Sequence, residues 1–199
     1  MRTWFRRCST LAGLALATVA LAATSASAQQ KVTAGVLGGA SFSTLTGTDS
    51  AVSPKSSTGF AGGFFVNFPV AKSLRVEPEI LYTNKGAGFE NEDFTLNLNY
   101  IEIPVLLRYE FTQDGGPFAY VGPYVAFNVK CNATVDTLAT PCADEDVDAN
   151  TVIGGAVGVG FRKAAWGFDI RYEYDFGDAV KQESGSNSAL MILLRVAVN

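Results

Sequence analysis

Several segments of the chain alternate between two kinds of side chain with a period of two residues. In residues 167–176, GFDIRYEYDF, aromatic residues and an isoleucine occupy every second position, and charged residues lie between them. Successive side chains of a β-strand point to opposite faces of its sheet, so this period predicts a strand with two unlike faces. The same alternation appears in residues 74–85, 100–111 and 189–198.

The remaining strands are predicted from segments rich in glycine, aromatic or β-branched residues. These segments are residues 31–42, 58–69, 118–129 and 151–161. Glycines there suit the bends and close approaches of a curved, closing sheet. Connections between the eight predicted strands alternate in length. The short ones are near residues 70–73, 112–117 and 162–165, and the long ones are near 43–57, 87–95, 131–150 and 177–187. This rhythm predicts an all-β fold, an eight-stranded antiparallel up-and-down transmembrane β-barrel with both termini toward the periplasm.

The beginning of the chain has the pattern of an export signal. Three arginines lie within the first seven residues, an apolar run covers residues 11–23, and Ala-Ser-Ala occupies 26–28. We predict a signal peptide at residues 1–28, cleaved after Ala28, which leaves a barrel domain at residues 29–199. The alternative is an uncleaved membrane anchor, which the short apolar run and the cleavage pattern disfavour.

Charged residues of both signs occupy the polar faces of the predicted strands. In a membrane the apolar faces would meet lipid, and the charges would line the barrel interior. An isolated buried ion is very costly, whereas opposite ions packed together satisfy each other. The predicted interior ion-pair network comprises Arg75, Glu77, Glu79, Glu102, Arg108, Glu110, Asp169, Arg171, Glu173, Asp175 and Arg195, with Lys85 on the same faces. Because eight strands leave room only for side chains, we expect a filled barrel rather than an open pore.

Aromatic residues near the predicted strand ends favour a membrane location. The residues expected to point outward there are Tyr82, Tyr109, Phe111, Phe118, Trp166, Tyr174 and Phe176. Such girdles are typical of membrane–water boundaries. The alternative is a soluble, lipocalin-like barrel with aromatic residues inside and charges in water. The export signal, the loop rhythm and the strand ends together favour the outer membrane.

Longer motifs resemble a known family. GVLGGASFSTLTG (35–47), VEPEILYTNKGAGF (76–89) and LNYIEIPVLLRYEF (98–111) resemble the PorT-like outer membrane protein β-barrel family, and YVGPYVAF (120–127) fits its next strand. The resemblance covers most of the chain after the signal. It implies a small barrel in the outer membrane lipid of a diderm bacterium. It implies little about activity, because most members have none assigned.

Candidate chemistry is sparse. The sequence has no histidine, which removes histidine-dependent catalytic triads and histidine-based metal sites. Glu77 with Glu79, and Glu173 with Asp175, share strand faces and would permit general acid–base chemistry. Arginines on the same faces favour structural ion pairs instead. We therefore predict no catalytic residue, no cofactor and no metal, and no enzymatic activity.

An acidic segment and two cysteines occupy one predicted long loop. In residues 142–150, CADEDVDAN, aspartates occupy alternate positions, as they do at the start of an EF-hand calcium-binding loop. The glycine and the closing glutamate of that loop are missing. A solvated loop is the prediction, with a weak divalent-ion contact as the alternative. Cys131 and Cys142 are the cysteines left after signal cleavage, and an oxidising compartment predicts a disulfide worth about 3 kcal/mol. Two free thiols are the alternative.

The charge balance and the long loops limit which functions are expected. Signal cleavage removes three of 15 basic residues and none of the 19 acidic ones, so a nucleic-acid partner is not expected. We expect a structural or interaction role in the outer membrane, in which the loops meet extracellular or envelope partners. The alternatives are a narrow porin that passes small solutes or ions, and a soluble ligand-binding barrel.

Overall fold

Nine β-strands make up the regular structure of the described residues. The computed structural model describes residues 31–46, 54–89, 94–112, 115–135, 138–141, 151–176 and 186–198. Its strands are β1 (Thr33–Thr46), β2 (Pro54–Ala71), β3 (Leu74–Phe89), β4 (Phe94–Glu110), β5 (Gly116–Val135), β6 (Leu138–Pro141), β7 (Val152–Lys163), β8 (Trp166–Asp175) and β9 (Ser186–Val198). Within these ranges no helix is long and apolar enough to cross a membrane.

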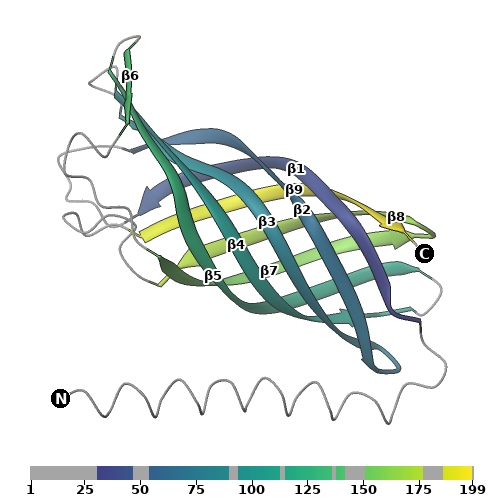
Figure 1. The fold of residues 1–199 in the computed structure, drawn as a ribbon. Helices are drawn as coiled ribbons and strands as arrows, with labels where there is room; N and C mark the ends of the chain where they lie inside the picture. The colour runs from purple at the N-terminus through teal and green to yellow at the C-terminus, as the bar shows by residue number, and fades with distance from the viewer. Residues whose placement is uncertain are drawn as a thin grey trace, which may run out of the picture.

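Eight of the strands form a closed antiparallel barrel (Figure 1). Consecutive barrel strands pair with one another, and β1 also pairs with β9, from Ala34 opposite Val198 to Thr46 opposite Ser186. The remaining pairings of β5, with β4 on one side and β7 on the other, complete the ring. The predicted eight-stranded up-and-down barrel is therefore confirmed.

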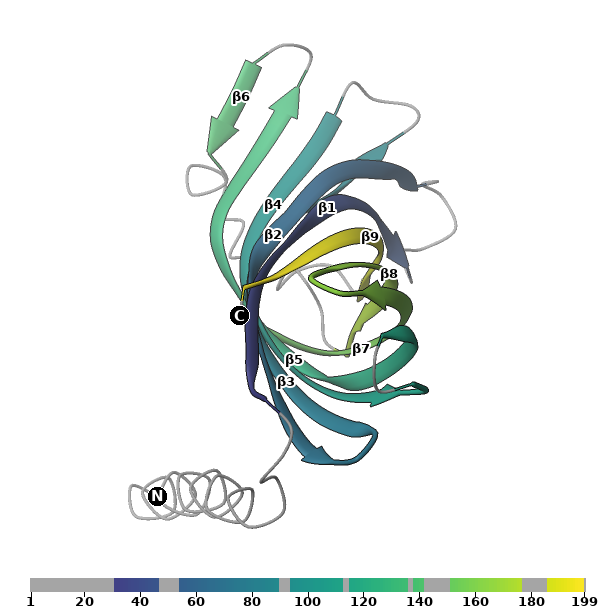
Figure 2. The same cartoon turned by 90° about the vertical axis from the view of Figure 1, so that its right-hand side faces the viewer.

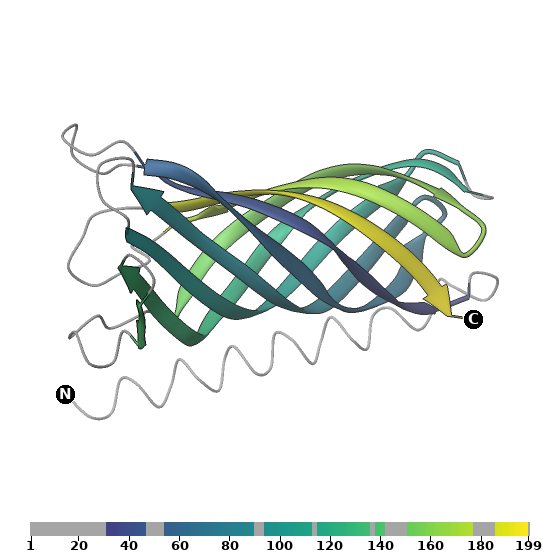
Figure 3. The ribbon, with the colours of Figure 1, turned by 90° about the horizontal axis from the view of Figure 1, so that it is seen from above.

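The two ends of the barrel differ, and we call them the turn end and the loop end. The turn end carries the tight β2–β3 and β7–β8 turns, at residues 72–73 and 164–165. Strand β1 starts and strand β9 finishes at this end (Figure 3). The opposite end is the loop end, where β5 continues beyond the rim and pairs with β6 (Figure 2). Strand β6 is thus an addition outside the barrel.

The strands run further than the sequence pattern predicted. Residues 43–57 and 87–95 were expected to be long connections, yet β1 continues to Thr46, β2 begins at Pro54, and β3 and β4 are separated only by residues 90–93. Likewise β5 continues to Val135. Crossing a membrane takes about 9–11 residues of a tilted strand, whereas β5 has 20. These extensions were predicted to be connections because their Ser, Thr and Asn residues favour contact with water. A strand that lies in water can still pair its backbone with the neighbouring strands, so polar residues do not end it.

The predicted faces of the four alternating segments are confirmed. In β8, Phe168 and Ile170 are 52% and 46% exposed on the outside, while Asp169 and Arg171 are fully buried inside. The same division holds along β3, β4 and β9. A continuous apolar outer surface with buried charges inside is the inverse of a water-soluble barrel, so the outward faces do not fit the soluble alternative.

Outward aromatic residues gather at both ends of the barrel. Tyr109 packs edge-to-face against Phe111 at the turn end, where Trp166 is also exposed. Tyr174 packs against Phe176 at the loop end. Rings at both boundaries match the girdles of a membrane barrel.

The prediction for Phe118 was wrong. Its side chain is 2% exposed and points into the barrel, where its ring centroid lies 3.6 Å from the Arg108 guanidinium carbon. Both faces of β5 carry aromatic or β-branched residues, so the local pattern did not identify the inner one. The buried guanidinium offers Phe118 a cation–π contact that lipid does not.

Candidate functional site

The barrel interior holds the polar side chains that form the candidate site. All residues of the predicted network lie on inner faces, and they form two groups along the barrel axis that meet where Nη1 of Arg171 lies 3.6 Å from Oε1 of Glu173. The turn-side group consists of Arg75, Glu77, Glu79, Arg108, Glu110, Asp169, Arg171 and Arg195, joined by Arg162. The loop-side group consists of Lys85, Glu102, Glu173 and Asp175 with Tyr124. Chain direction explains this division, since β3 and β8 both run from the turn end to the loop end.

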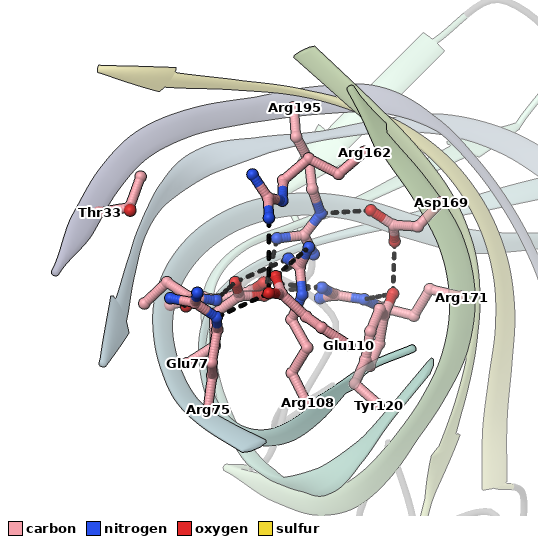
Figure 4. Close-up of polar contacts among 12 residues, drawn as sticks. Thr33, Arg75, Glu77, Arg108, Glu110, Tyr120, Arg162, Asp169, Arg171 and Arg195 are labelled. Carbon is pink, nitrogen blue, oxygen red and sulfur yellow. Dashed lines mark hydrogen bonds and ion pairs between the residues drawn. The ribbon is translucent and has the colours of Figure 1, made fainter. Parts of the chain in front are cut away.

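Arg195 is the centre of the turn-side group (Figure 4). From β9 its Nη1 donates to Oε1 of Glu77 at 2.8 Å, and its Nη2 donates to Oε1 of Glu79 at 2.9 Å. Its Nε donates to Asp169 on β8. One guanidinium therefore links β9 to β3 and β8 across the interior, which the planar fork of donors in arginine makes possible.

Arg171 and Tyr120 extend this group across the barrel. Arg171 donates from Nη2 to Glu79 at 2.9 Å and from Nε to the Tyr120 hydroxyl at 3.0 Å. That hydroxyl in turn donates to Asp169. Arg171 is fully buried, so its charge is stabilised by these partners rather than by water.

Glu110 is the shared partner of three arginines near the turn end. Its carboxylate lies 2.9 Å from Nε of Arg75, 3.4 Å from Nη2 of Arg108 and 3.4 Å from Nη2 of Arg162. Arg108 also donates to Glu77 at 3.0 Å. The sequence reasoning missed Arg162 because it assigned residues 162–165 to a connection, whereas β7 continues to Lys163.

The loop-side group surrounds a single lysine. Nζ of Lys85 lies 2.6 Å from Glu102 and 2.9 Å from Glu173, and all three side chains are almost fully buried. The Thr83 hydroxyl donates to Glu102 at 2.8 Å. Within this group Asp175 accepts a hydrogen bond from the Tyr124 hydroxyl. The geometry therefore places the paired carboxylates beside cations and hydroxyl donors, as structural ion pairs require.

A cavity of about 80 Å³ lies at the turn end, beyond the turn-side group. Its charged lining consists of Arg75, Arg108, Glu110, Arg162 and Arg195. Among its other lining residues are Phe118 and Trp166. No sequence signal had indicated this cavity, because its residues come from all eight barrel strands and the β7–β8 turn.

Comparison with known proteins identifies the fold family. A family model described as "Outer membrane protein beta-barrel domain" matches residues 27–181. The chain belongs to this outer membrane β-barrel family. The match supports an outer membrane barrel but does not extend to the PorT-like resemblance, which stays a prediction.

Solved outer membrane barrels share the fold of this family member. Neisserial surface protein A is 17% identical, with a TM-score of 0.55, and the match covers 84% of this chain and 99% of that one. The attachment invasion locus protein of Yersinia pestis, Ail, is 13% identical, with a TM-score of 0.53, and the match covers 85% and 100% of the two chains. Among curated proteins, none matches the sequence of this barrel.

Three predictions fall outside the described part of this outer membrane barrel. The signal peptide at residues 1–28 and the acidic segment at 142–150 are not among the described residues. Cys142 belongs to the same segment, whereas Cys131 lies in β5 opposite Leu98. The disulfide and the signal peptide therefore stay predictions. Among the described residues no group of His, Cys, Asp or Glu side chains is arranged to hold a metal ion.

Proposed function

We propose that this outer membrane protein is a membrane-embedded scaffold whose loop end meets extracellular or envelope partners, and that its interior is plugged. The observation that carries the proposal is the buried network at mid-barrel. Glu77 and Arg171 are fully buried, Glu79 is 2% exposed, and Arg195 is 3% exposed. Side chains held by several ion pairs occupy the space that a solute would need.

The energetics support a plug rather than a gate. Removing one partner from a buried ion pair typically costs about 3–5 kcal/mol, because an uncompensated charge remains. A solute passing the centre would have to separate Arg195 from three carboxylates and Arg171 from Glu79 and Glu173. We expect the closed arrangement to dominate and the function to lie at the barrel ends.

The loop end is the favoured interaction surface. Strands β5 and β6 extend beyond the barrel rim there (Figure 2), and the longest connections belong to this end. The two structural neighbours are named as a surface protein and an attachment protein, and one of them, Ail, was also solved with the heparin analogue sucrose octasulfate. Their names are consistent with contact at the cell surface, which is the role proposed here.

A narrow porin is the second candidate, and unpartnered interior atoms favour it. In the loop-side half, the Tyr100 hydroxyl, Oε2 of Glu102 and both side-chain polar atoms of Asn187 are buried without a hydrogen-bond partner. Water molecules would satisfy such groups. If water filled both the loop-side half and the turn-end cavity, the central ion pairs would be the remaining barrier to the passage of a small solute or ion.

Conductance across a planar bilayer distinguishes the two candidates. The protein extracted from outer membranes is compared with Arg171→Ala, which opens the centre, and with Ile170→Ala, the neighbouring outward residue. A plugged scaffold gives no steps for the native protein and for Ile170→Ala, with steps only in Arg171→Ala. Reproducible steps in the native protein that change in Arg171→Ala, but not in Ile170→Ala, would establish the porin instead.

A photo-crosslinking residue tests the interaction role directly. It is placed at Ala139 in β6 and, as the matched control, at Ala164 in a turn. Defined crosslinked species in intact cells from position 139 alone would support the loop end as the interaction surface. Species from position 164 alone would place the interaction at the turn end and contradict the proposal.

A further inference from the structure

The turn-end cavity has an unusual excess of positive charge. Four arginines line it, Arg75 from β3, Arg108 from β4, Arg162 from β7 and Arg195 from β9, and Glu110 is the single carboxylate in its lining. Figure 4 shows the arginine side chains converging on this end of the network. The lining also includes Ala164 and Ala165 of a turn, and the Arg162 side chain is 29% exposed, so the cavity is accessible to water.

The excess is concentrated at Glu110. Arg195 and Arg108 also pair with carboxylates deeper in the barrel. Arg75 and Arg162, by contrast, have Glu110 as their ion-pair partner within the described residues. One carboxylate carries one negative charge, so it leaves about one positive charge uncompensated at the mouth of the cavity.

Donor groups remain available as well as charge. Nε of Arg108 is buried without a hydrogen-bond partner, and the Arg108 guanidinium is held in place by the ring of Phe118. The contacts of Glu110 with Arg108 and Arg162, both at 3.4 Å, are longer than the 2.7–2.9 Å typical of strong charge-assisted hydrogen bonds. The Nη2 donors of Arg108 and Arg162 can therefore pair with a second oxyanion without losing a strong bond, while Nη1 of Arg108 keeps its hydrogen bond to Glu77 at 3.0 Å.

The size of the cavity limits the ligand. A volume of about 80 Å³ holds several waters or one small anion, since one water needs roughly 10–15 Å³ measured in this way. Guanidinium groups bind tetrahedral oxyanions through paired N–H donors. We propose that this cavity binds one phosphate group, coordinated by Arg75, Arg108 and Arg162. The site is independent of the role proposed for the loop end.

Binding is measured on protein extracted from outer membranes into a maltoside detergent, which contains no phosphate. Equilibrium dialysis with radiolabelled inorganic phosphate gives the affinity, with chloride at equal ionic strength as the reference. Fluorescence of Trp166, which lines the cavity, reports the location. The other tryptophan of the sequence, Trp4, lies in the predicted signal peptide. We expect saturable phosphate retention and a fluorescence change over the same concentration range.

Two charge-removing variants separate a built site from general surface charge. Arg162→Gln removes a lining donor, whereas Lys163→Gln removes the same charge from the next, exposed position of β7. The proposal predicts about tenfold weaker phosphate binding in Arg162→Gln and less than about twofold change in Lys163→Gln. A shift between boiled and unboiled samples on a gel checks that both variants are folded. Equal weakening in both variants, or no saturable retention in the native protein, would overturn the proposal.

A second titration distinguishes a free anion from a lipid headgroup. Short-chain phosphatidic acid is compared with inorganic phosphate. Equal or tighter binding of inorganic phosphate identifies a site for the free anion. Binding of the lipid about tenfold tighter than inorganic phosphate, and still dependent on Arg162, identifies a headgroup site in the adjoining leaflet.

Discussion

Replacing Arg195 by methionine tests whether the ion-pair network stabilises the barrel. Methionine keeps a long, unbranched side chain at this position but removes the charge and its donors. Arg195 is 3% exposed and contacts Glu77, Glu79 and Asp169, so three buried carboxylates each lose a cationic partner. We expect the folded barrel to be destabilised.

The magnitude follows from what each carboxylate retains. Glu77 and Glu79 each keep one arginine, and Asp169 keeps one hydroxyl donor. These remaining partners are Arg108, Arg171 and Tyr120. Because no carboxylate is left entirely alone, we place the loss at the lower end of the range for a broken buried pair, about 3 kcal/mol.

Urea unfolding of the barrel in lipid vesicles measures this loss through Trp166 fluorescence. Arg75→Met is the matched control, because Arg75 lies at the turn end and its side chain is 12% exposed. Among the described residues its ion-pair partner is Glu110, and its Nη1 also donates to Oδ1 of Asn67 at 3.1 Å. We expect this control to lose no more than about 1 kcal/mol. If Arg195→Met and Arg75→Met lose the same amount, or if Arg195→Met loses less than about 1 kcal/mol, then burial does not amplify these ion pairs.

Three further predictions follow from the same structure. Ile103→Arg places a charge on the lipid-facing side of β4, where Ile103 is 42% exposed, and should cost about 2–4 kcal/mol near the midplane; the folded yield in vesicles, compared with Ile103→Ala, measures it, and an unchanged yield would contradict the face assignment. Lys85→Met removes the cation of Glu102 and leaves Glu173 with Arg171, at 3.6 Å, and should lose about 3 kcal/mol in urea unfolding. In the double variant Lys85→Met/Glu102→Gln, part of that stability should be recovered. If the double variant loses the sum of the losses of the two single variants, the two residues are not coupled. Cys131 and Cys142 should resist thiol labelling until reductant is added, and reduction should leave the gel shift of the folded barrel unchanged; labelling without reductant would show free thiols.

The alternating pattern predicted four strands, and the charge on one face of each was sufficient to predict which face is inner. Side chains of a strand point to opposite faces whatever the strand pairs with, so the period of residues 100–111 and 167–176 is a local property of the backbone. Which of the two faces is inner was inferred from charge, since mixed charges can be buried together in an eight-stranded interior. The structure has these faces as predicted for β3, β4, β8 and β9.

The pattern was insufficient where both faces of a strand look alike or where polar residues continue a strand. Strand β5 presents aromatic or β-branched residues on both faces, and the side of Phe118 was decided by the position of Arg108 on β4. Arg162 was missed because residues 162–165 were assigned to a connection, although backbone pairing with Gly116 and Gly167 keeps Arg162 in the sheet.

The partners within the interior were decided by tertiary structure alone. Arg195 and Glu77 are 118 positions apart in the chain, and Arg171 and Glu79 are 92 apart. Composition predicted that acids and bases would pair, but the stagger between neighbouring strands decides which charges reach the same level of the barrel. The turn-end cavity has the same origin. Its arginines belong to four strands, and only closure of the barrel brings three of them, Arg75, Arg108 and Arg162, around Glu110.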